Sequence, residues 1–151
     1  MQHDPDNSNR LPVWLIPNIT VFFSSACIMM VELVAGRIIA PHLGMSLYTW
    51  TAIIGVIMAG ISLGNYLGGK IADRCRTRRA LTALFFLAAL GCAVILPLNA
   101  FIGNFSPAAQ LSWPVRIFTQ VFLVFIAPAM FLGMIHPVVA KMALDYKRAQ
   151  A

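Results

Sequence analysis

The chain has 151 residues, of which 60% are hydrophobic and only 11% are charged. A soluble domain needs more charged surface than this, so the composition excludes a conventional soluble enzyme or binding domain and indicates a membrane protein. The net charge of +6 would also suit a nucleic-acid-binding protein. The basic residues, however, gather at the ends of predicted spans, which the positive-inside rule explains better. We therefore expect the lipid bilayer, and no nucleic acid, as a partner.

Apolar stretches long enough to cross a bilayer, which takes about 20 residues of helix, occupy most of the chain. Residues 1–17 are predicted to be a cytoplasmic tail with an interfacial segment, 18–141 a transmembrane domain, and 142–151 a second cytoplasmic tail. The fold class that follows is all-α, a multi-pass membrane protein with a bundle of four transmembrane helices. The predicted spans cover residues 18–40, 47–71, 80–98 and 115–139.

The first span carries two ionisable residues at membrane depth, Glu32 and Arg37. Such groups are costly in a bilayer and usually face a bundle interior, a cavity or each other. On a helix their spacing turns the two side chains about 140° apart, so a salt bridge within the helix is unfavourable and each is expected to find a partner on another helix. Functional and structural roles are equally open for Glu32. For Arg37, which can snorkel to the interface, a structural role is favoured.

The second span contains a repeat of glycine at every fourth residue, Gly60, Gly64 and Gly68. At this spacing the glycines line one face of a helix and let another backbone approach closely, and Gly55 extends the small surface. The repeat predicts tight helix packing, either inside the bundle or between copies of the chain. It carries no information about a substrate.

A strongly basic loop is predicted after the second span, with Asp73 among its cations. The remaining predicted loops contain only Arg116 as a basic residue, at the edge of a span. The positive-inside rule therefore places the basic loop and both termini in the cytoplasm, which indicates the cytoplasmic (inner) membrane. Asp73 is expected to balance charge at a helix terminus or to pair with another helix end. The basic residues of this predicted docking loop are Lys70, Arg74, Arg76, Arg78 and Arg79.

Further polar residues lie within the predicted spans. Asn65 and Gln120 are expected to form hydrogen bonds across helices. His136 is more often a hydrogen-bonded structural group in such a position than a ligand or a proton carrier. Pro128 and Pro137 are expected to kink the fourth span.

Motifs of a self-contained enzyme are missing from the sequence, which has no phosphate-binding glycine loop and no zinc-protease motif. The cysteines, Cys27, Cys75 and Cys92, are odd in number and are not spaced as a zinc site or a redox pair. We therefore expect no enzymatic activity, no catalytic residue, no cofactor and no metal.

Two parts of the chain resemble known membrane families. Residues 69–79, with Gly69 ahead of Asp73 and Arg74, are similar to the signature of the second-to-third loop of the major facilitator superfamily. Most of the chain looks like the membrane part of spermidine synthase-like transmembrane proteins, which are fusions of a facilitator-like domain with a spermidine synthase domain. The stretches that carry this second resemblance are 32–44, 46–51, 60–73 and 133–141.

The resemblance implies a facilitator-like membrane domain that works with a cytosolic Rossmann-like synthase domain. No glycine-rich nucleotide-binding loop is present in these 151 residues, so no catalytic residue is carried over, and a neighbouring protein is expected to supply the soluble half. At His136 the family more often has a small polar residue. Four spans are also too few to form the two-lobed transport path of a full facilitator.

Three functions are left open. The first is a non-catalytic anchor or scaffold for a spermidine synthase-like partner, of aminopropyltransferase or methyltransferase fold, which docks on the basic loop. The second is a transporter-like homo-oligomer, assembled through the face of Gly60, Gly64 and Gly68, in which Glu32 binds a cation such as a polyamine. The third is a small accessory subunit of a larger respiratory or photosynthetic complex.

Overall fold

The computed structural model describes residues 15–74, 77–104 and 112–148. All of its helices are long and apolar enough to cross a membrane, and no strand occurs within the described ranges. These findings confirm the predicted all-α fold class and identify a multi-pass membrane protein. The four helices are α1 (Leu15–Leu43), α2 (Leu47–Arg74), α3 (Thr77–Asn104) and α4 (Trp113–Arg148).

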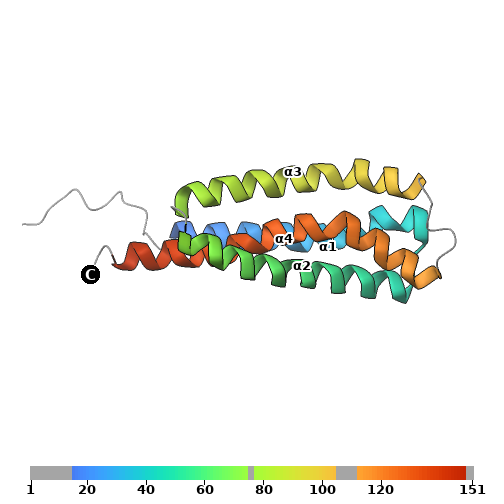
Figure 1. Cartoon of the computed structure of the whole chain (residues 1–151), viewed down its shortest axis with the longest axis horizontal. Coiled ribbons are helices and arrows are strands. Elements are labelled where there is room, and N and C mark those ends of the chain that lie inside the picture. Colours follow the sequence, from blue (N-terminus) through green and yellow to red (C-terminus); the bar gives the residue numbers. More distant parts are fainter. Residues whose placement is uncertain (1–14, 75–76, 105–111, 149–151) are drawn as a thin grey trace, which may run out of the picture.

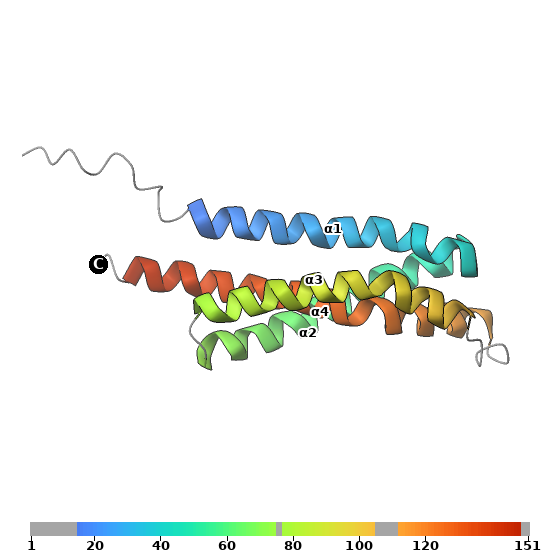
Figure 2. The same ribbon diagram turned by 90° about the horizontal axis from the view of Figure 1, so that it is seen from above.

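The helices run along one common axis and alternate in direction (Figure 1). The start of α1, the end of α2, the start of α3 and the end of α4 therefore lie at the same end of the bundle. Helix α4 is central, because it packs against each of the other three, while α1, α2 and α3 make few contacts with one another. Figure 2 shows α2 beginning beside the end of α1 and crossing α4, so that its last turns lie on the side of α4 away from α1. The contact between α2 and α4 is the most extensive.

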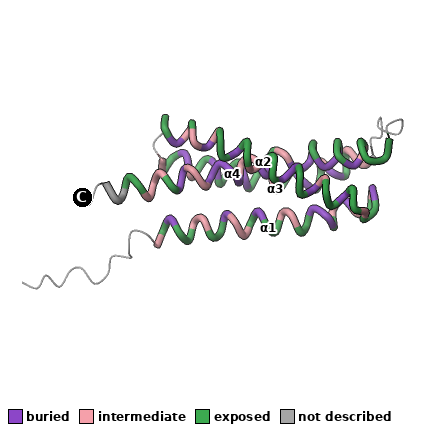
Figure 3. The backbone as a smooth tube through the Cα atoms, turned by 90° about the horizontal axis from the view of Figure 1, so that it is seen from below, coloured by how far each residue is buried: buried purple, intermediate pink, exposed green. Residues whose placement is uncertain are grey.

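Burial follows this arrangement. In the apolar stretch of α4, 56% of the residues are buried, against 17% in that of α3, and buried positions recur along one side of each outer helix (Figure 3). The outer faces of α1, α2 and α3 carry exposed Leu, Met and Phe side chains. In a bilayer these faces contact lipid tails that are as apolar as the side chains themselves, so their exposure is not costly.

The turn between α1 and α2 is held by local hydrogen bonds. Gly44 has a φ of 73°, and its N–H donates to the Ala40 carbonyl at 2.9 Å, which ends α1. Ser46 caps α2, because its Oγ accepts a hydrogen bond from the Thr49 N–H at 3.3 Å. The Thr49 hydroxyl in turn donates to the Gly44 carbonyl at 3.1 Å. Helix α1 continues through Pro41 before this turn begins.

The helices extend beyond the predicted spans. Helix α3 continues through Pro97 to Asn104, although residues from Asn99 onward were expected to form a loop. That expectation was wrong because the buried Asn99 side chain has hydrogen-bond partners inside the bundle, so this asparagine does not end the helix.

The predicted basic loop and C-terminal tail are also largely helical. Helix α2 reaches Arg74 and α3 begins at Thr77, so most of the expected loop consists of helix ends. Helix α4 continues to Arg148, so residues 142–148 of the predicted tail are helical. Lysine and arginine are good helix formers and do not by themselves end a helix.

Candidate functional site

The contact between α2 and α4 is built on the glycine repeat. Gly60, Gly64 and Gly68 are buried on the face of α2 that meets α4. A Cβ atom at Gly68 would lie 2.6 Å from the Met134 carbonyl oxygen, and one at Gly64 would overlap the Met130 carbonyl oxygen. The two backbones are therefore in direct contact, as small residues at helix interfaces allow.

The same contact corrects part of the transporter hypothesis. Because α4 of the same chain covers Gly60, Gly64 and Gly68, this face is not open for assembly of copies, as that hypothesis required. Gly133 of α4 completes the contact, since a Cβ there would lie 2.8 Å from the Ile61 Cα. Gly133 was not among the predicted packing residues, because it stands alone rather than in a repeat.

Gly55 lies outside the α2–α4 contact. It is exposed, and a Cβ atom there would meet nothing within 4 Å. Its expected role in extending the packing surface of Gly60 is therefore wrong within the single chain. The reason is geometric, because five residues of helix turn Gly55 about 140° away from Gly60.

A buried polar network joins three helices near the end of the bundle where α3 ends and α4 begins. The Gln120 side-chain amide of α4 donates to the Asn99 Oδ1 of α3 at 3.0 Å. The Asn99 side-chain amide donates to the Ile38 carbonyl of α1 at 3.2 Å. Both side chains are only 4% exposed. The bond across helices expected of Gln120 is therefore present, and the role of Asn99 was not foreseen.

His136 forms a second link between α1 and α4. Its Nε2 lies 3.2 Å from the Ser25 Oγ, within hydrogen-bond distance. The histidine thus occupies a structural position between two helices. The next residue, Pro137, packs against Gly68. A Cβ atom added at Gly68 would lie 2.8 Å from the Pro137 Cγ.

Glu32, Arg37 and Asn65 do not behave as expected. Glu32 is half-buried, while Arg37 and Asn65 are exposed. Within the described residues, none of the three forms an ion pair or a hydrogen bond through its side chain. The expectation of partners on other helices is therefore wrong for the isolated chain, because α1 makes few contacts with α2 and α3, and Asn65 faces away from α4.

Cations gather at the end of the bundle where α2 ends and α3 begins, which we call the basic end. At the opposite end the described basic residues are Arg37 and Arg116. The basic end contains Lys70, Arg74, Arg78, Arg79 and Lys141, of which the first four are exposed, and the last turn of α4 adds Lys147 and Arg148. Arg76, which was also predicted to belong here, lies outside the described residues.

Two contacts order the basic end. The Lys141 Nζ of α4 lies 3.3 Å from the Asp73 Oδ1 of α2 and also donates to the Ala72 carbonyl. Asp73 therefore pairs with a residue near the end of another helix, which is one of the two roles expected for it. Lys70 extends over the Tyr66 ring, with its Nζ 4.4 Å from the ring centroid. These contacts orient the Lys141 and Lys70 side chains.

The described part of the chain contains no group of three or more His, Cys, Asp or Glu residues placed to hold a metal ion. Comparisons with protein-family models, curated protein sequences and solved structures found no match to the chain. The candidate site is the basic end, where exposed lysine and arginine side chains gather.

Proposed function

We propose that the chain is a non-catalytic membrane module that anchors a cytosolic protein of the spermidine synthase-like class at the inner membrane. The observation that carries the proposal is the charge asymmetry of the bundle, whose exposed lysines and arginines gather mainly at one end. By the positive-inside rule this end lies in the cytoplasm. Both chain termini would then also be cytoplasmic, since α1 begins and α4 ends there.

The basic end has the features of a docking surface. Lys70 and Arg74 lie one helical turn apart on α2, and they point away from α4 because Gly68 and Ala72 occupy the buried face. The ion pair between Asp73 and Lys141 ties this end of α2 to α4. A partner with an acidic surface would be steered to this group of cations.

The class of partner rests on the resemblance of the sequence to spermidine synthase-like transmembrane proteins. In that family a cytosolic synthase domain of aminopropyltransferase or methyltransferase fold accompanies a facilitator-like membrane domain. The proposed partner is therefore a protein of that fold, and the membrane module would set its location rather than take part in its reaction.

Reversing two charges on α2 tests the docking surface. We expect the Lys70→Glu/Arg74→Glu variant to lower partner affinity by more than about tenfold, because it sets like charges against an acidic partner surface. The measurement is the ratio of partner to chain after purification in a mild detergent. Arg116→Glu is the control, since Arg116 lies at the opposite end of the bundle. An unchanged ratio in the double variant, or an equal loss in the control, would contradict the proposal.

A transporter-like unit is the second candidate, and one observation favours it. Glu32 is half-buried inside a membrane span and has no side-chain partner within the described residues, a position often occupied by ion-binding groups. Copies would have to assemble through a face other than the glycine repeat, which α4 covers.

Neutralising Glu32 separates the two candidates. If the chain is an anchor, Glu32→Gln retains the partner as the parent chain does, and proteoliposomes containing either protein take up no more labelled polyamine than protein-free liposomes. Uptake by the parent chain that disappears in the variant would instead support the transporter.

A further inference from the structure

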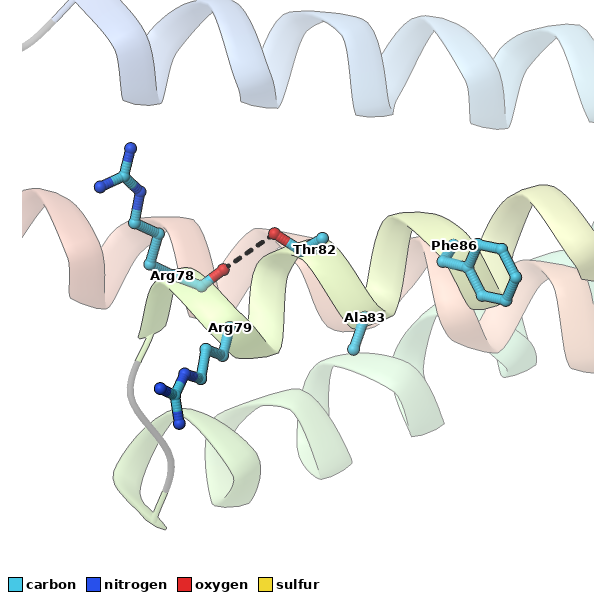
Figure 4. A pocket seen from close by; sticks show the side chains of 5 residues that line it. All are labelled: Arg78, Arg79, Thr82, Ala83 and Phe86. Carbon is cyan, nitrogen blue, oxygen red and sulfur yellow. Dashed lines mark hydrogen bonds between the residues drawn. The ribbon is translucent and has the colours of Figure 1, made fainter.

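The outer face of α3 contains an open hollow of about 690 Å³. Its lining residues are all exposed and lie outside the face of α3 that packs on the bundle, where Ala80, Leu84 and Ala88 are buried. In Figure 4 the Arg78 and Arg79 side chains extend to opposite sides of α3 at one end of a strip that leads to Phe86. The residues that line the hollow are Arg78, Arg79, Thr82, Ala83 and Phe86.

The two arginines supply the positive charge of the hollow. Among the described residues, none that lines it is acidic, and neither guanidinium group forms an ion pair. The Thr82 hydroxyl donates to the Arg78 carbonyl at 3.2 Å, so it is already engaged within the helix (Figure 4). The available donors are therefore guanidinium N–H groups, whose planar geometry matches the oxygens of a phosphate.

The rest of the hollow is apolar and extends toward the membrane interior. Phe86 lies two helical turns after Arg78, about 12 Å along the axis at 1.5 Å per residue, and it is 70% exposed. Ala83 lies one helical turn after Arg79, on the side of α3 to which Arg79 extends (Figure 4). The hollow thus begins with cations at the end of a membrane span and continues as an apolar surface along that span. A soluble phosphate would use only the charged half.

We propose that this face of α3 binds one anionic phospholipid. Its phosphate lies at the charged end of the hollow, in the electrostatic field of both guanidinium groups, which extend to opposite sides of α3. The upper part of an acyl chain runs along the strip to Phe86. Basic pockets at the ends of membrane helices are suited to anionic headgroups. This inference goes beyond the anchor function and does not depend on it, because it needs only the chain and the bilayer.

Native mass spectrometry of the purified full chain, with added lipids of matched acyl chains, tests the proposal. We expect the parent chain to retain phosphatidylglycerol in preference to phosphatidylcholine. The Arg78→Gln/Arg79→Gln variant should retain phosphatidylglycerol about 30-fold less, from the roughly fivefold that each arginine contributes at a membrane surface. Thr82→Val should retain it as the parent does, because its hydroxyl is engaged within the helix.

Lys70→Gln/Arg74→Gln is the matched control. It also removes two positive charges from the basic end, but neither residue lines the hollow. It should leave retention unchanged, and excess inorganic phosphate should not displace the lipid. Equal loss in this control, retention by the Arg78→Gln/Arg79→Gln variant, equal binding of phosphatidylcholine, or displacement by phosphate would each overturn the proposal. No partner protein is present, so failure here is separate from failure of the anchor function.

Discussion

Gly68→Ala is expected to destabilise the bundle by about 3 kcal/mol, at the upper end of the usual cost of overpacking. The added methyl group would lie 2.6 Å from the Met134 carbonyl oxygen and 2.8 Å from the Met134 Cα. Both atoms belong to the backbone of α4, so no side-chain rotation can relieve the contact. Helices α2 and α4 would have to move apart along their most extensive interface. The measurement is thermal unfolding of the purified chain in detergent.

Gly69→Ala is the matched control, because the two glycines are adjacent in the same helix. A Cβ atom at Gly69 meets nothing within 4 Å, and alanine has the higher helix propensity by about 1 kcal/mol. We therefore expect unchanged or slightly raised stability for Gly69→Ala. Equal melting temperatures for the two variants would show that α2 does not present this face to α4.

The network of Asn99 and Gln120 is expected to give the second-largest effect. Gln120→Leu leaves the Asn99 Oδ1 without the donor it has now, at a site that is 4% exposed. A buried polar group without a hydrogen-bond partner lowers stability by about 1–3 kcal/mol, and the bilayer core contains no water that could replace the lost partner. We expect a loss of about 2 kcal/mol in the free energy of unfolding, measured by unfolding in a denaturing detergent.

The pairwise nature of this network is tested by a double-mutant cycle. Asn99→Leu should also destabilise the bundle, because it removes the bond to the Ile38 carbonyl as well as the acceptor for Gln120. The Asn99→Leu/Gln120→Leu variant should lose less than the sum of the single variants, since it leaves neither amide unpaired. Strict additivity would mean that the two side chains do not depend on each other.

The fold could be predicted from the sequence because it depends on local properties. Length and hydropathy define membrane spans, and the fourfold spacing of Gly60, Gly64 and Gly68 indicates one closely packed face. What the repeat cannot indicate is which helix covers it. That answer depends on Gly133 and Ile61, which meet only after the chain has folded.

The polar residues of the site were less predictable, because the sequence does not show which residues of other helices lie next to them. Asn99 has the propensity of a turn residue, yet its partners on α1 and α4 keep it inside a helix. Glu32 and Arg37 were expected to have partners because charge in a bilayer is costly. Helix α1 makes few contacts with α2 and α3, and neither side chain has an ion-pair partner within the described residues.

The composition of the complex purified from the native membrane tests the anchor function most directly. A tagged chain would be isolated in a mild detergent, and the mass of the intact particle would be measured. We expect the chain together with one cytosolic protein of spermidine synthase-like fold, in a fixed ratio. A particle of this chain alone, or one containing only large membrane subunits, would contradict it and would support a transporter or an accessory subunit instead.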